Sequence, residues 1–141
     1  MSDLDATTPS IFLVRHGETE WTKNGRYTAI TDIPLTAEGE RQVESTTKQL
    51  VGPGRLIDPG RVAHVRVSPR RRAQQTFRLL FGDDSAEVAD EKVALTEDFA
   101  EWGYGDYEGL VAEDIVRRRK PKAWTKPASI VSEGTGVKAA R

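Results

Sequence analysis

The residues best suited to chemistry form one short cluster near the N-terminus. His16 stands between Arg15 and Gly17, directly after an apolar run at residues 11–14 (Ile-Phe-Leu-Val). A neutral imidazole can accept a phosphoryl group, and it needs no metal when fixed cations hold the phosphate. The Arg15 guanidinium matches phosphate geometry bidentately, and Gly17 lets backbone approach a ligand closely. The cluster therefore predicts phosphoryl chemistry at His16.

Composition excludes several other chemistries. The 141 residues contain 22 acidic and 21 basic side chains and no cysteine, so disulfides, thiolate zinc sites and a thiol nucleophile are excluded. The sequence has no Gly-x-x-x-x-Gly-Lys-Ser/Thr loop and no residue cluster at metal-ligand spacing, so we expect no metal and no cofactor. No apolar run approaches the roughly 18 residues that a membrane span needs. We therefore expect one domain, no membrane partner and a cytoplasmic location.

Secondary structure must position these residues, and hydrophobic periodicity predicts it. The run at 11–14 is typical of a strand buried on both faces. Ligands bind open α/β sheets where such strands end, which is where His16 lies. His64, inside a second expected strand, has no motif around it and is interpreted as structural. Alternating strands and helices predict a parallel sheet; the further elements expected are strands 62–67 and 93–95 and helices 36–50 (capped by Thr36), 68–81 and 110–120.

Four ordered motifs resemble those of the histidine phosphatase superfamily, in its phosphoglycerate mutase-like branch. They are residues 13–19 (Leu-Val-Arg-His-Gly-Glu-Thr), 32–39 (Asp-Ile-Pro-Leu-Thr-Ala-Glu-Gly), 68–76 (Ser-Pro-Arg-Arg-Arg-Ala-Gln-Gln-Thr) and 101–109 (Glu-Trp-Gly-Tyr-Gly-Asp-Tyr-Glu-Gly). The resemblance implies a three-layer α/β/α fold of phosphoglycerate mutase type. Residues 10–122 would form the N-terminal part of this domain, after a disordered leader at 1–9.

The resemblance also implies roles, residue by residue. His16 would be the nucleophile that forms a phosphohistidine, and Arg15 and Arg72 would bind the phosphoryl oxygens. Glu101 would protonate the leaving sugar alkoxide and then deprotonate the attacking water. Helical spacing points the three arginines in different directions, so Arg72 is expected to face inward and its neighbours Arg70 and Arg71 to be solvated. The positions that match the family's substrate pocket are Thr22, Thr28, Ala29 and Tyr104.

The substrate and reaction leave alternatives open. Glu20-Trp21, Tyr27-Thr28 and the 101–109 block resemble fungal sedoheptulose-1,7-bisphosphatase-like members, which favours a metal-independent phosphatase acting on sugar phosphates. A phosphoglycerate mutase-type phosphotransferase is the first alternative. The absence of an asparagine at Thr22 weakly favours hydrolysis over that reaction. The second alternative is a remnant that binds a phosphorylated ligand without turnover.

The family pattern stops after about residue 122, and the fold is expected to be incomplete at the C-terminus. Family members have a second catalytic histidine in a later His-Gly motif, whereas no histidine follows His64 here. Residues 123–141 have no periodicity and are expected to be a disordered tail. One hypothesis is a frame slip, a misplaced splice junction or a truncated gene after codon 122, which transcript sequencing would test. We expect this chain to be weakly active or inactive, and prone to aggregate.

Charge is distributed unevenly along the chain. Residues 1–116 contain 21 acids and 13 bases, whereas residues 117–141 contain one acid and eight bases. The basic run at 117–122 could be a nuclear-localisation or nucleic-acid signal, which leaves a nuclear location open besides the cytoplasm. Continuation of the helix at 110–120 is the favoured interpretation, so we expect no nucleic-acid partner. The expected partner is a phosphorylated sugar, and the oligomeric state cannot be predicted from the sequence.

Overall fold

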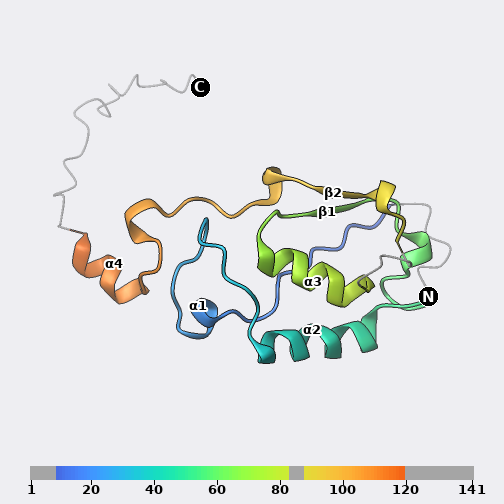
Figure 1. Cartoon of the computed structure of the whole chain (residues 1–141), viewed down its shortest axis with the longest axis horizontal. Coiled ribbons are helices and arrows are strands. Elements are labelled where there is room, and N and C mark those ends of the chain that lie inside the picture. Colours follow the sequence, from blue (N-terminus) through green and yellow to red (C-terminus); the bar gives the residue numbers. More distant parts are fainter. Residues whose placement is uncertain (1–8, 83–87, 120–141) are drawn as a thin grey trace, which may run out of the picture.

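The computed structural model describes residues 9–82 and 88–119 (Figure 1). Its regular elements are connected by long loops and short 3-10 turns. No helix in the described ranges is both long and apolar enough to cross a membrane. The helices and strands are α1 (Glu20–Lys23), α2 (Ala37–Leu50), β1 (Val65–Val67), α3 (Arg71–Phe81), β2 (Val93–Leu95) and α4 (Ala112–Arg118).

Helix α2 begins where the sequence predicts. The hydroxyl of Thr36 accepts a hydrogen bond from the backbone N–H of Gly39 at 3.0 Å, which satisfies one of the free donors of the first turn. Helix α3 begins at Arg71, later than the expected start at Ser68–Pro69. The Arg71 N–H donates to Asp32 Oδ1 at 2.7 Å, so a carboxylate from a distant loop satisfies a free donor of the first turn in place of a side-chain cap from Arg70.

The sheet is parallel, as predicted, but smaller than expected. Strand β1 pairs with β2 in the register Val65↔Val93 to Val67↔Leu95. The expected strand at 62–67 begins only at Val65, because the Val62 N–H donates to Pro59 O and closes a turn. His64 is therefore exposed just before β1 rather than inside a strand, which corrects the prediction.

The predicted buried strand at residues 11–14 is wrong. Ile11 and Leu13 are each 86% exposed, and Phe12 and Val14 are 46% and 52% exposed. A strand is buried on both faces only when other strands flank it and helices cover it. In the described part of the chain no strand pairs with this segment. Apolar side chains of α2, α3 and the loop at 51–57 lie beside the segment on one side.

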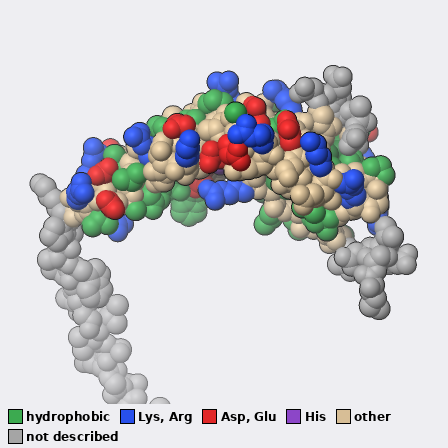
Figure 2. Space-filling view, turned by 90° about the horizontal axis from the view of Figure 1, so that it is seen from below, with side chains coloured by type: hydrophobic (Ala, Val, Ile, Leu, Met, Phe, Trp, Pro, Cys, Tyr) green, Lys and Arg blue, Asp and Glu red, His purple; other side chains and the backbone are tan. Residues whose placement is uncertain are grey.

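The core lies between α2, α3 and the adjoining loops and strand. Helix α3 packs against β1, and α2 packs against α3 (Figure 1). The described residues thus form an α/β structure with a small sheet, and they do not show the complete three-layer arrangement. On the lower side of the molecule, positive and negative side chains are intermixed over the outer surface (Figure 2). The buried core residues are Leu35, Val43, Val51, Ile57, Leu80, Phe81 and Val88.

Of the basic run at 117–122, the structure describes residues 117–119, which form the end and the C-cap of α4. Arg117 lies near Glu113 and Asp114, at 3.9 and 3.5 Å, and Arg118 donates to the backbone oxygen of Asp106 at 3.2 Å. These contacts favour the helical interpretation over a nucleic-acid signal. The expected leader at 1–9, the boundary at 122 and the tail at 123–141 fall almost entirely outside the described residues and stay predictions.

Candidate active site

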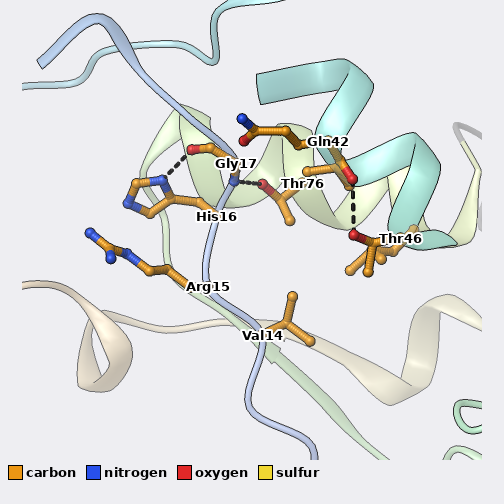
Figure 3. A pocket seen from close by; sticks show the side chains of 9 residues that line it. Val14, Arg15, His16, Gly17, Gln42, Thr46 and Thr76 are labelled. Atoms are coloured by element: carbon orange, nitrogen blue, oxygen red, sulfur yellow. Dashed lines mark hydrogen bonds between the residues drawn. The ribbon is translucent and has the colours of Figure 1, made fainter. Parts of the chain in front are cut away.

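The segment carrying His16 is anchored on helix α3. The Gly17 N–H donates to Thr76 Oγ1 at 3.3 Å, and that hydroxyl donates to the Arg72 carbonyl at 2.8 Å. Arg15 and His16 project to the same side of the segment (Figure 3). A cavity of about 200 Å³ opens beside them between the segment, α2 and α3, and it is lined by Val14, Arg15, His16, Gly17, Gln42, Val43, Thr46, Thr76 and Leu80.

The imidazole of His16 is held in one tautomer. Its Nδ1 lies 2.8 Å from the carbonyl oxygen of Gly17, and a carbonyl oxygen can only accept, so Nδ1 carries the proton. Burial lowers the pKa of His16 below 6.5, and the charges of Arg72 and Arg15 act in the same direction, against the Gly17 bond and Glu101. The ring is therefore neutral at pH 7, with a lone pair on Nε2.

Arg72 is buried, with only 3% of its surface exposed. Its two terminal nitrogens donate to the carbonyl oxygens of Thr31 and Ala29, at 3.1 and 3.0 Å. Burial lowers the pKa of Arg72 below its ordinary value, but an arginine remains charged at neutral pH. The prediction that Arg72 faces inward is confirmed. Arg71 is exposed as expected, whereas Arg70 is half-buried and pairs with Glu97 at 3.3 Å.

Glu101 and Tyr104 act as a pair in the acidic loop. The Tyr104 hydroxyl donates to Glu101 Oε1 at 3.1 Å, and the Tyr104 ring meets Tyr27 edge-on with centroids 5.0 Å apart. Burial raises the pKa of Tyr104, and the hydrogen bond to the Glu101 carboxylate raises it further. The charge of Glu101 acts on both His16 and Arg72, so this carboxylate faces the same site.

Comparison with known proteins agrees with this arrangement. Residues 11–139 match the histidine phosphatase superfamily (branch 1). The chain belongs to this superfamily. It is 39% identical to the sedoheptulose 1,7-bisphosphatase of Saccharomyces cerevisiae over 87% of the chain and 46% of that protein. It is also 39% identical to an acid phosphatase of Mycobacterium tuberculosis, over 82% of the chain and 51% of the relative.

The fold comparison gives the same family. The alpha-ribazole phosphatase from Shigella flexneri superposes with a TM-score of 0.59 at 28% identity, covering 74% of this chain and 46% of that one. The chain spans about half the length of the curated relatives it matches. The described residues thus form a part of the histidine phosphatase fold.

The predicted site residues of this histidine phosphatase chain fall into two groups. The charges of Arg15, Arg72 and Glu101 act on His16, the charge of Glu101 also acts on Arg72, and Tyr104 joins them through its hydrogen bond to Glu101. The expected substrate-lining residues at 22–29 have other contacts in this structure. Thr22 closes the capping box of α1 with Thr19, the Thr28 hydroxyl lies 3.4 Å from the Arg26 carbonyl, and Ala29 is fully buried. Their role in substrate binding stays a prediction.

One residue that contacts this site was not among the sequence candidates. Glu108 Oε1 accepts hydrogen bonds from the backbone N–H groups of Ala29 and Thr31, both at 2.9 Å. The available signal was its place in the 101–109 motif. Its partners lie 79 and 77 residues away in the chain, so spacing alone could not reveal the contact. Within the described ranges, no group of three or more His, Asp or Glu side chains is placed to hold a metal.

Proposed function

We propose that this chain carries the nucleophile and the phosphate-binding cations of a phosphatase that works through a phosphohistidine. The observation that carries the proposal is the Nδ1 bond of His16 to Gly17 O. It leaves the Nε2 lone pair available as a nucleophile at neutral pH. Arg15 and Arg72 supply positive charge beside it, where guanidinium groups stabilise the phosphoryl oxygens without a metal.

The reaction has two balanced steps. In the first, Nε2 of His16 attacks phosphorus, the bond from phosphorus to the sugar oxygen breaks, and Glu101 gives its proton to the leaving alkoxide. In the second, Glu101 takes a proton from water while the water oxygen attacks phosphorus. The phosphorus–nitrogen bond then breaks and the histidine is regenerated. One carboxyl group therefore serves as acid and then as base.

The proposed substrates are phosphorylated sugars such as sedoheptulose 1,7-bisphosphate. The support is the 39% identity to the yeast sedoheptulose 1,7-bisphosphatase. The site's own chemistry supports the broader class, a small phosphate monoester, because the positive charges of two arginines act on a neutral imidazole. The chain is also 36% identical, over 88% of its length, to a relative named as a probable phosphoglycerate mutase. Phosphoryl transfer to a second substrate is therefore tested as well.

One observation favours a second candidate function, phosphate binding without turnover. The chain contains only two histidines, and His64 is exposed before β1. The second catalytic histidine that the family resemblance implies is therefore absent from these 141 residues. The cluster of Arg15, His16 and Arg72 could still bind a phosphorylated ligand.

Trapping of the phosphohistidine separates these candidates. The full chain is mixed with a sugar bisphosphate, quenched under alkaline denaturing conditions that preserve phosphohistidine, and analysed by mass spectrometry. We expect one phosphoryl group on His16, lost in His16→Ala and retained in the control His64→Ala, together with release of inorganic phosphate. Saturable phosphate binding with no adduct would support the second candidate. Neither adduct nor binding would overturn both, and transfer to added 3-phosphoglycerate without hydrolysis would favour the mutase reaction.

A further inference from the structure

Two side chains of opposite charge bind the turn at residues 29–31. Glu108 binds its backbone N–H groups, and Arg72 binds its carbonyl groups. Glu108 Oε1 accepts from the N–H groups of Ala29 and Thr31, both at 2.9 Å. The Arg72 guanidinium donates to the carbonyl oxygens of the same two residues, at 3.0 and 3.1 Å. Ala29 and Thr31 are therefore each bound through both their backbone N–H and their backbone carbonyl, and the positions of the carbonyls determine where the guanidinium can lie.

The charges of Glu108 and Arg72 also act on each other. Burial opposes ionisation of Glu108, but the two amide hydrogen bonds and the positive charge of Arg72 outweigh it, so its pKa lies below the ordinary value. Glu108 in turn favours the charged form of Arg72. The two amide hydrogen bonds are made by one oxygen, Oε1, so the position of this acceptor determines the position of the turn.

The backbone around Glu108 links this turn to the acidic loop. The Gly109 N–H donates to Tyr27 O at 2.8 Å, and the Tyr27 N–H donates to Leu110 O at 2.9 Å. Arg26 and Val111 form an adjoining antiparallel bridge. Glu108 thus stands where the loop that carries Glu101 returns to the turn that orients Arg72.

We propose that Glu108 is a positioning residue of the phosphate site: its Oε1 fixes the Ala29–Thr31 turn, and the carbonyl groups of that turn aim Arg72 toward a phosphate bound at His16. The proposal rests on the proposed function only in taking Arg72 as a phosphate ligand. Glu108 itself touches no reacting atom. What it contributes is an acceptor oxygen at a defined place, more than a negative charge.

Two conservative variants of the full chain separate the acceptor from the charge. Glu108→Gln keeps an oxygen at the same reach and loses the charge, whereas Glu108→Asp keeps the charge and withdraws the oxygen by one methylene. Asp106→Ala, which removes an exposed carboxylate from the same loop, is the matched control. The measurements are the dissociation constant for inorganic phosphate, amide hydrogen exchange at Ala29 and Thr31, the His16 pKa by NMR and the free energy of unfolding in urea.

We expect Glu108→Gln and Asp106→Ala to retain slow exchange at both amides and to bind phosphate within about threefold of the unmodified chain. In Glu108→Asp both amides should exchange faster and phosphate affinity should fall about tenfold, which corresponds to the loss of about one hydrogen bond to a charged group. As Arg72 withdraws, its effect on His16 weakens, and the pKa of His16 should rise in Glu108→Asp alone.

Three results would overturn the proposal. The first is phosphate affinity unchanged in Glu108→Asp although the chain is destabilised, which would make Glu108 merely structural. The second is a Gln variant that is as weak as, or weaker than, the Asp variant, which would make the charge the active feature. The third is a His16 pKa that is the same in all variants. If the unmodified chain binds no phosphate, the proposed function fails, while exchange at the two amides and the His16 titration still decide the role of Glu108.

Discussion

Gly17 and Gly39 lie in direct backbone contact, and this contact seats the start of helix α2 beside the segment that carries His16. A Cβ placed on Gly17 would lie 2.5 Å from the carbonyl oxygen of Gly39, and one on Gly39 would collide with the backbone of Glu18. The Thr36 N–H donates to Glu18 O at 2.9 Å, which closes the same junction. The motif at residues 13–19 therefore packs directly against the motif at residues 32–39, although the two are separate in sequence.

Gly39→Ala tests this contact. Alanine is about 1 kcal/mol better than glycine inside a helix, but the clash is with backbone that cannot rotate away, and overpacking costs about 1–3 kcal/mol or more. We expect the clash to dominate, with a net loss of about 2 kcal/mol in the free energy of unfolding measured in urea. Gly103→Ala, with no atom within 4 Å of its added Cβ, is the control, and equal stability of the two variants would contradict the contact.

His16 predicts a pH dependence of stability. Burial and the two arginines hold its folded-state pKa below 6.5. At pH values near and below 6.5 the unfolded chain therefore binds more protons than the folded chain, and the free energy of unfolding rises with pH. The contribution of His16 is present above about pH 6.5 and is lost as the pH falls below that value. Urea unfolding of the unmodified chain and His16→Ala at several pH values measures it. A difference between them that is independent of pH would refute the expectation.

The Tyr104–Glu101 bond predicts a coupled titration. The Glu101 carboxylate raises the pKa of the Tyr104 hydroxyl beyond the effect of burial. Glu101→Gln removes the negative charge, so the Tyr104 pKa should fall, as followed by NMR of its ring carbons. Glu97→Gln, a change of the same type at a carboxylate that pairs with Arg70, should leave Tyr104 unchanged. An unchanged Tyr104 pKa in Glu101→Gln would mean that the two side chains are not hydrogen-bonded in solution.

The exposed segment at 11–14 predicts aggregation. Ile11 and Leu13 are its most exposed side chains, and exposed apolar extended segments pair with other chains. The double variant Ile11→Lys, Leu13→Lys should increase the monomer fraction in size-exclusion chromatography while the free energy of unfolding changes by no more than about 0.5 kcal/mol per site. The matched double variant Phe12→Lys, Val14→Lys changes the less exposed positions and should lower stability more. Equal aggregation of the Ile11/Leu13 variant and the unmodified chain would contradict this.

Local patterns in the sequence predicted much of the local structure. Helix α2 with its Thr36 cap, the parallel pairing of β1 with β2, and the inward orientation of Arg72 all follow from capping, periodicity and motif spacing. Only the Thr36 cap depends on residues close in the chain; the pairing of β1 with β2 and the bonds of Arg72 join distant residues that the periodicity and the motifs indicated indirectly. The predicted strand at 11–14 failed because its burial requires flanking strands that the described residues do not supply.

The sequence by itself determined the chemical types in the site: an imidazole between an arginine and a glycine, a second arginine on a helix, and a carboxylate in an aromatic loop. Only the structure decided which nitrogen of His16 is free: Nδ1 is occupied by the carbonyl of the adjacent Gly17, whose own N–H is held by the distant Thr76. It also decided that Glu108 holds the turn which aims Arg72. Hydrogen bonds between groups 40 to 80 residues apart have no local signature, since they arise only when folding brings separate segments together.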